Sequence, residues 1–219
     1  MKGTFITFEG TEGSGKSTQI LLLANFLKSR DMRVMLTREP GGTPIGDQVR
    51  RILLDPAHTA LDPKAELLLY AASRAQHLYE VILPALASGM IVLCDRFSDA
   101  TLAYQGYGRG LDIEMIRALD RIVCAGTRPD LTLLFDIDAA LGIARAHGRN
   151  TSRGLETEAR FENEELAFHE RVRQGYRTLA RQEPDRIRIV DASPAQEAVE
   201  MNVRTIMDEV LLRTVDRQQ

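Results

Sequence analysis

Apolar residues along this chain fall into short continuous runs that alternate with longer segments of mixed polarity. Four runs of strand length are almost wholly apolar, at residues 4–9, 33–37, 91–95 and 131–136, and a fifth, at 186–191, alternates between apolar and polar positions. Strands without a polar face are typical of a parallel sheet that is covered by helices on both sides. We therefore expect five strands in one buried sheet.

Between these runs, apolar residues recur at helical spacing. The spacing predicts helices over residues 16–29, 45–54, 64–87, 99–105, 112–124, 138–147 and 194–213. Asp62-Pro63 is a typical start for the long helix over 64–87, and Ser88-Gly89 is a typical end. The repeated strand–helix units predict an α/β fold with a five-stranded parallel sheet flanked by helices. Because no linker or internal repeat interrupts them, we expect a single domain over residues 1–219.

Composition narrows the range of partners. The 219 residues include 28 basic and 31 acidic side chains, a net charge of −3 that argues against a protein that coats nucleic acid. No apolar run reaches the length of a membrane span, and the N-terminus enters a strand almost at once. Cys94 and Cys124 have neither disulfide-framework nor metal spacing. We expect a cytoplasmic protein that binds small molecules, without nucleic acid or membrane.

The strongest motif lies between the first expected strand and the first expected helix. Residues 10–17 match G-x-x-x-x-G-K-[ST], in which glycines let the backbone approach phosphate oxygens. Lys16 can reach the β- and γ-phosphates of a nucleotide, and the Ser17 hydroxyl can bind Mg²⁺. The candidate ATP-binding residues of this loop are Gly10, Thr11, Glu12, Gly13, Ser14, Gly15, Lys16, Ser17 and Thr18.

Charged pairs close the second and third expected strands. Arg38-Glu39 follows one strand and Asp95-Arg96 ends the other. Ligands of parallel α/β sheets bind at the carboxyl ends of strands, so both pairs are expected to face one cleft. There, Asp95 could hold the coordination shell of Mg²⁺ together with Ser17, and Arg96 could bind a second phosphate. A surface ion pair is the alternative interpretation.

The least hydrophobic stretch of the chain is residues 149–158, flanked by Arg145 and Arg160. It can be interpreted as an ordinary solvated connection between two helices or as a lid over the phosphates. Beside a phosphate-binding loop we favour a short lid over residues 147–160, because phosphoryl transfer needs positive charge and exclusion of water.

The chain resembles the bacterial thymidylate kinases, which belong to the P-loop nucleoside monophosphate kinases. The segments that carry the resemblance are Phe8-Glu9-Gly10, Thr37-Arg38-Glu39-Pro40-Gly41-Gly42-Thr43, Asp95-Arg96-Phe97, Ala103-Tyr104-Gln105-Gly106 and Arg128-Pro129-Asp130-Leu131. The resemblance implies the P-loop kinase fold and transfer of the γ-phosphoryl group of ATP to dTMP, with Mg²⁺, in dTTP biosynthesis. It also implies a homodimer.

The resemblance further implies roles for single residues in binding dTMP. Tyr70 would stack on thymine, with Arg74, one helical turn away, at the base edge. Arg96 would bind the monophosphate, and Tyr104 would lie near the sugar 2′ position. The complete set of candidate substrate residues is Glu9, Arg38, Glu39, Arg50, Tyr70, Arg74, Arg96, Thr101, Tyr104 and Gln105. Without the resemblance, a core aromatic is the favoured interpretation of Tyr70, and a solvated helix charge is the alternative for Arg74.

With the acidic residue Glu12 in its loop, the chain resembles those family members in which the lid supplies the catalytic arginine. Arg153 is then the first candidate and Arg149 the second, while Arg145 would pack on adenine. The candidate catalytic residues are Lys16, Arg96, Arg149 and Arg153.

Three positions depart from the family pattern, and two other functions stay open. Ala100, Phe97 and Ala159 stand where the family usually has serine, tyrosine and aspartate, so the lid alignment is the least secure. One alternative function is a kinase for another nucleoside monophosphate. The other is a nucleotide-dependent switch, against which the absence of a guanine-reading N-K-x-D motif counts.

Overall fold

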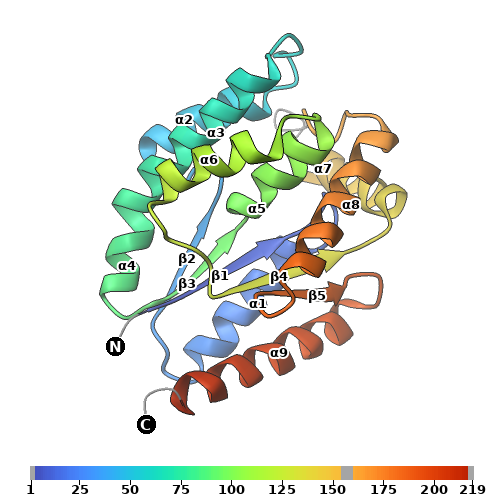
Figure 1. Cartoon of the computed structure of the whole chain (residues 1–219). Coiled ribbons are helices and arrows are strands. Elements are labelled where there is room, and N and C mark those ends of the chain that lie inside the picture. The colour runs from blue at the N-terminus through green and yellow to red at the C-terminus, as the bar shows by residue number, and fades with distance from the viewer. Residues whose placement is uncertain (1–2, 154–159, 217–219) are drawn as a thin grey trace.

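A computed structural model of the chain describes residues 3–153 and 160–216, with backbone alone for 149–153 and 212–216. The strands of these residues form one five-stranded parallel sheet in the order β2-β3-β1-β4-β5 (Figure 1). They are β1 (Thr4–Glu9), β2 (Val34–Arg38), β3 (Ile91–Asp95), β4 (Leu131–Asp136) and β5 (Ile187–Asp191). The predicted fold class is confirmed, and β1, which leads into the glycine-rich loop, lies at the centre of the sheet.

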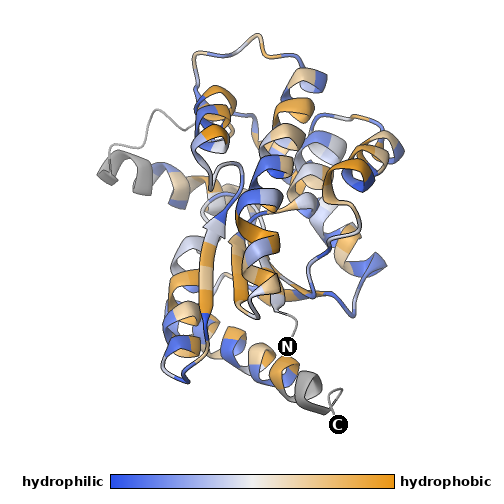
Figure 2. Cartoon of the chain, turned by 90° about the vertical axis from the view of Figure 1, so that its left-hand side faces the viewer, coloured by the Kyte–Doolittle hydropathy of each residue, from blue (hydrophilic) through white to orange (hydrophobic). Residues whose placement is uncertain are grey.

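Helices cover both faces of the sheet, and strand residues alternate between them. Ile6 and Phe8 of β1 pack toward α1 (Lys16–Lys28) and α9 (Gln196–Asp216), where α1 contributes Leu23 and Leu27. Phe5 of β1 packs on the opposite face against the helical run over residues 63–87. Figure 2 shows the same arrangement as hydrophobic strands surrounded by helices of mixed polarity. Both faces are buried, which explains the continuous apolar strands of the sequence.

The long helix predicted over 64–87 is one helical run with a change of hydrogen-bond pattern. It consists of α3 (Pro63–His77), a π-helical turn η1 (Leu78–Ile82) and α4 (Leu83–Ala87). The Asp62 carboxylate accepts hydrogen bonds from the backbone of Lys64 and Ala65, so the predicted start is confirmed. Ahead of it, Thr43 caps α2 (Pro44–Leu54) through the backbone N–H of Gly46.

Two other helices differ from the predicted ranges. Residues 98–108 form a short α5 (Ser98–Thr101) that widens into a second π-helical segment, η2 (Leu102–Gly108), before α6 (Ile113–Cys124). The helix expected to end near 147 is α7 (Ala139–Arg153), so the first part of the expected lid is helical. The rest of that lid, residues 154–159, lies outside the described residues.

The helix α8 (Leu166–Gln182), which follows the expected lid, is not among the predicted helices. Its sequence carries many charges, but the buried residues Phe168, Val172, Tyr176 and Leu179 recur at helical spacing. That face packs against η2, with which α8 makes its largest interface. The two helices together form one wall above the carboxyl ends of the central strands (Figure 1).

Candidate active site

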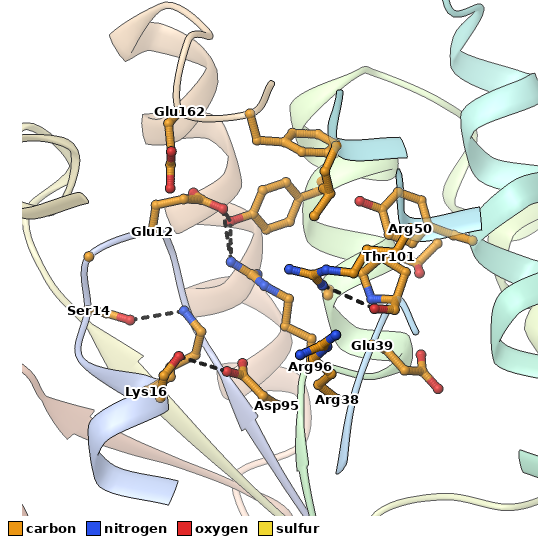
Figure 3. Close-up of a pocket in the computed structure, with 18 of the residues that line it drawn as sticks. Glu12, Ser14, Lys16, Arg38, Glu39, Arg50, Asp95, Arg96, Thr101 and Glu162 are labelled. Carbon is orange, nitrogen blue, oxygen red and sulfur yellow. Dashed lines mark hydrogen bonds and ion pairs between the residues drawn. The ribbon is translucent and has the colours of Figure 1, made fainter. Parts of the chain in front are cut away.

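A cavity of about 530 Å³ opens at the carboxyl ends of β1, β2 and β3. Its lining residues are Glu12, Gly13, Ser14, Gly15, Lys16, Ser17, Thr18, Arg38, Glu39, Pro40, Arg50, Leu54, Tyr70, Asp95, Arg96, Ala100, Thr101, Tyr104, Gln105, Arg145, Phe161 and Glu162. Figure 3 shows Glu12 and Lys16 on one side, Arg38, Arg50 and Glu39 on the other, and Arg96 between them. The topology therefore brings the glycine-rich loop and the charged strand ends to one space.

The glycine-rich loop forms one wall of this cavity. Gly13 and Gly15 have φ angles of 68° and 85°, and a Cβ on Gly13 would lie 1.9 Å from the carbonyl oxygen of Gly142. Gly15 caps α1, so the N-terminus of that helix opens toward the cavity. An N-terminus with its free N–H groups and positive dipole end is suited to binding an anion.

Lys16 is the buried cation of the loop. Its Nζ donates to the carbonyl oxygens of Gly10 at 3.0 Å and Thr11 at 2.7 Å, and to Ser14 Oγ at 3.2 Å. Burial, together with the nearby charge of Arg96, lowers the pKa of Lys16 to about 8. A phosphate beside Lys16 would favour its charged form.

Arg96 stands at the centre of the cavity and joins three elements. Its guanidinium donates to Glu12 Oε1 at 2.9 Å, Tyr104 Oη at 3.0 Å and Tyr176 Oη at 3.1 Å. Its backbone has a φ of 70°, which is uncommon for a residue with a side chain. Such backbone conformations persist where surrounding contacts hold them, often at functional sites.

Glu12 is the acceptor to which Arg96 and Tyr104 both donate. Tyr104 Oη donates to Glu12 Oε1 at 2.6 Å, the same oxygen that receives Arg96. Burial by itself would raise the pKa of the Glu12 carboxyl, but the charge of Arg96 and the nearby His169 outweigh it and hold that pKa well below its usual range. The acidic residue of the loop is therefore an ionised partner of Arg96.

Ser17 and Asp95 bring two oxygen groups together beside Lys16. Ser17 Oγ donates to Asp95 Oδ2 at 3.1 Å. Within the described part of the chain, no group of three or more histidine, cysteine or acidic side chains is arranged around a common metal position. A hydroxyl and a carboxylate are nevertheless the hard oxygen donors that suit Mg²⁺, which usually keeps several waters.

The opposite wall is built around a buried ion pair. Arg74 donates through Nε to Glu39 Oε2 at 2.8 Å and through Nη2 to Thr101 Oγ1 at 2.8 Å. The other oxygen of Glu39 lies 3.0 Å from Nδ1 of His77. Glu39 and Thr101 line the cavity, whereas Arg74 is only 3% exposed and lies behind them.

Aromatic and guanidinium groups complete this wall. Tyr70 and Phe161 line the cavity with their ring centroids 6.4 Å apart. Arg50 Nη1 donates to the carbonyl oxygen of Pro40 at 3.1 Å, and Arg38 reaches Asp47 at 3.5 Å. Arg145, which also lines the cavity, donates to the carbonyl oxygens of Ala192 and Ser193.

Not every candidate residue reaches the cavity surface. Glu9, Gly10, Thr11 and Arg74 do not line it. Glu9 is fully buried and accepts from the Phe97 backbone at 2.7 Å and from Tyr176 Oη at 2.7 Å. Burial, together with the charge of Asp99, raises the pKa of Glu9 to about 8. The side chains of Arg149 and Arg153 lie outside the described residues.

Sequence reasoning missed several residues of the site. Phe161 and Glu162 line the cavity from the segment that leads into α8, and Tyr176 and His169 reach Arg96 and Glu12 from α8 itself. The spacing of seven residues between His169 and Tyr176 places both on one helical face, a signal that the sequence contains.

A P-loop kinase of the nucleoside monophosphate class is defined by three of these features. They are the glycine-rich loop after the central strand, the arginine between that loop and a second wall, and the order of the parallel sheet. A family model described as thymidylate kinase matches residues 8–203. The chain belongs to the thymidylate kinase family.

Individual relatives agree over nearly the full length. A thymidylate kinase of Trichlorobacter lovleyi is 59% identical over 211 residues, covering 95% of this chain and 97% of the relative. One from Geobacter sulfurreducens is 52% identical over 216 residues, covering 99% and 100%. The crystal structure of thymidylate kinase from Ehrlichia chaffeensis superposes with a TM-score of 0.75 at 35% identity, covering 95% and 99% of the two chains.

These findings confirm the resemblance read from the sequence and establish a kinase that acts on nucleotides. Among the helices of residues 3–153 and 160–216, none is long and apolar enough to cross a lipid bilayer.

Proposed function

We propose that this enzyme transfers the γ-phosphoryl group of ATP to dTMP, giving dTDP for dTTP biosynthesis, with Mg²⁺ as cofactor. The observation that carries the proposal is the single cavity of about 530 Å³ that the phosphate-binding loop and the Glu39–Tyr70–Thr101 wall share. Two nucleotides bound to opposite walls of one cavity would bring donor and acceptor phosphates together, which is the main requirement of phosphoryl transfer.

The loop side would hold ATP. Its backbone N–H groups and Lys16 would bind the β- and γ-phosphates, and Arg145 would pack on adenine. Ser17 and Asp95 would hold Mg²⁺, which when bound offsets the charge of the phosphate oxygens. Arg149 and Arg153 would add positive charge to the transferring group, with Arg153 the first candidate.

The opposite wall would hold dTMP. Tyr70 would stack on thymine, Thr101 and Gln105 would bind its polar groups, and Arg50 and Arg96 would hold the monophosphate. Because Arg74 and Glu9 lie behind the cavity surface, Arg74 would act through Glu39, and Glu9 through Tyr176, which accepts from Arg96. The acceptor phosphate is already anionic, so the reaction needs no strong general base.

Wider properties of the enzyme are also proposals. The outward residues Leu68 on α3 and Ile122 on α6 are 58% and 78% exposed, and Tyr79 between α3 and α4 is 77% exposed. We propose that this apolar face joins two copies into a homodimer, and that the enzyme works in the cytoplasm on small molecules without nucleic acid or membrane. The thymidylate kinase family membership supports all of these properties.

Turnover with ATP and a panel of nucleoside monophosphates tests the proposed reaction. We expect dTDP formation that requires Mg²⁺, with kcat/KM for dTMP exceeding that for dCMP, dGMP and UMP by about tenfold or more. Lys16→Ala is the matched inactive variant, with a loss of at least about a hundredfold in kcat at unchanged Tm. Preference for another monophosphate would overturn the proposed acceptor, and nucleotide hydrolysis without transfer would indicate a switch.

A further inference from the structure

His169 is a buried histidine without the partners that such a residue normally has. It lies on α8, is 1% exposed, and neither of its ring nitrogens has a hydrogen-bond partner among the described residues. The contrast is His77 on α3, also fully buried, whose two ring nitrogens lie 2.5 Å from Thr37 Oγ1 and 3.0 Å from Glu39 Oε1. Because buried polar groups are nearly always paired, the exception at His169 needs a physical explanation.

The group that His169 faces is also unpaired. Its Nδ1 lies 3.5 Å from Oε2 of Glu12, and this oxygen is buried without a hydrogen-bond partner. The other oxygen of Glu12 receives both Arg96 and Tyr104. Since Glu12 is ionised, Oε2 can only accept, so a favourable contact needs the proton of the imidazole on Nδ1.

A hydrogen bond from His169 would give both carboxylate oxygens of Glu12 a donor. Arg96 from the end of β3, Tyr104 from η2 and His169 from α8 would then fix the carboxylate from three directions. A carboxylate held on both oxygens has one orientation, and so has the guanidinium that it binds. Glu12 and Arg96 line the cavity, whereas His169 does not.

We propose that His169 is a positioning residue of the phosphoryl transfer, which through Nδ1–H and Glu12 Oε2 sets the orientation of Arg96. The inference rests on the proposed function, in which Arg96 holds the monophosphate of the acceptor. His169 therefore acts on binding and alignment of dTMP and leaves binding of ATP unchanged.

Kinetics of three variants of α8 separate positioning from packing. His169→Phe keeps an aromatic ring and loses the donor, and we expect kcat/KM for dTMP to fall about tenfold while KM for ATP changes less than about twofold. His169→Asn places an amide N–H near Nδ1 and should restore most of the loss. Val172→Ala, on the same buried face without polar contacts, controls for packing and should lower only Tm.

The same set of variants shows how the proposal fails. If His169→Phe behaves like Val172→Ala, or if the asparagine variant gives no rescue, His169 is a packing residue. If the wild-type enzyme itself does not phosphorylate dTMP, the proposed function fails, and the kinetic comparison is then made with the monophosphate that it does accept.

A measurement on the unaltered enzyme keeps the proposal testable if the variants misfold. Nitrogen-15 NMR of the histidine rings distinguishes a proton on Nδ1 from one on Nε2. We expect the His169 signal to show protonated Nδ1, and to move when Glu12 is replaced in Glu12→Gln. A bare Nδ1 in the wild-type enzyme would overturn the proposal.

Discussion

Two glutamates, the fully buried Glu66 and the largely buried Glu12, each bind an arginine and a side chain of η2, yet only Glu12 lines the cavity. Glu66 on α3 has both oxygens bonded, one to Gln105 at 2.7 Å and the other to Arg160 at 2.5 Å, with Arg109 close to both. Glu12 has one oxygen bonded twice and the other without a hydrogen bond. Tyr104 and Gln105, adjacent in sequence, thus serve two different clusters.

The Glu66 cluster mainly holds the fold, since Gln105 is its one member that lines the cavity, whereas Glu12, Arg96 and Tyr104 all line the cavity. Arg160 also donates to the carbonyl oxygen of Leu53, so the Glu66 cluster ties α2, α3, η2 and the segment before α8 together. A buried network with all its bonds made is rigid and costly to break. Because all three residues of the Glu12 cluster line the cavity, we expect loss of this cluster to lower activity more than stability.

The largest expected effect comes from Arg96→Lys, which keeps the charge of the Glu12 cluster but loses the planar fork. Lysine cannot contact Glu12, Tyr104 and a phosphate at once, so we expect kcat/KM for dTMP to fall by about a hundredfold to a thousandfold. Steady-state kinetics give this value, and thermal unfolding should show a change in Tm of only a few degrees. A near-normal kcat/KM would remove Arg96 from the transferring phosphates.

The second test breaks the Glu66 cluster. Glu66→Gln leaves Arg160 without its carboxylate and Arg109 with Glu164 alone, and removal of one member of a buried ion pair costs about 3 kcal/mol. We expect urea unfolding to show this loss, while kcat of the folded fraction at 10 °C changes less than about threefold. If activity falls while stability does not, the roles assigned to the two clusters are reversed.

The same two clusters show how far the sequence predicts this molecule. The sheet follows from the apolar runs, and the P-loop follows from spacing, because both depend on residues that are close in the chain. The position of Arg96 also follows from the sequence, because Arg96 comes directly after the end of the predicted third strand. The sequence does not predict that Tyr104 and Gln105 belong to different clusters, because their partners Glu12 and Glu66 are distant from them in the chain.

Residues that depend on distant partners were the least predictable. Arg74 has the spacing expected of a cavity residue, but the buried Glu39 and Thr101 draw its guanidinium behind the wall. Arg160, flanking the expected lid, is held by Glu66, 94 positions away in the chain. The helix α8 received no predicted bounds because its charges conceal its buried face. Tertiary ion pairs of this kind leave no local pattern.

The last test concerns a pH dependence, at Glu9, which is another buried carboxylate and is connected to Arg96 through Tyr176. Its pKa is raised from 4.5 to about 8, first by burial and then by Asp99. Between these values the folded protein binds more protons at this group than the unfolded chain does. The free energy of unfolding therefore falls as pH rises through this window.

Glu9→Gln removes this titration and resembles the neutral carboxyl, with an amide oxygen that can accept from the Phe97 backbone and an amide N–H that can donate to Tyr176 Oη, so the variant tests the sign directly. From pH 4.5 to about 8, we expect wild-type stability to decline relative to the variant, by at most about 1.4 kcal/mol per pH unit, and the difference to become constant above that range. Urea unfolding at several pH values measures the two curves. Parallel curves between pH 5 and 8 would mean that Glu9 is ionised in the folded protein, as Glu12 is. The distinction between these carboxylates would then rest on cavity contact alone, and burial would no longer explain which of them carries charge.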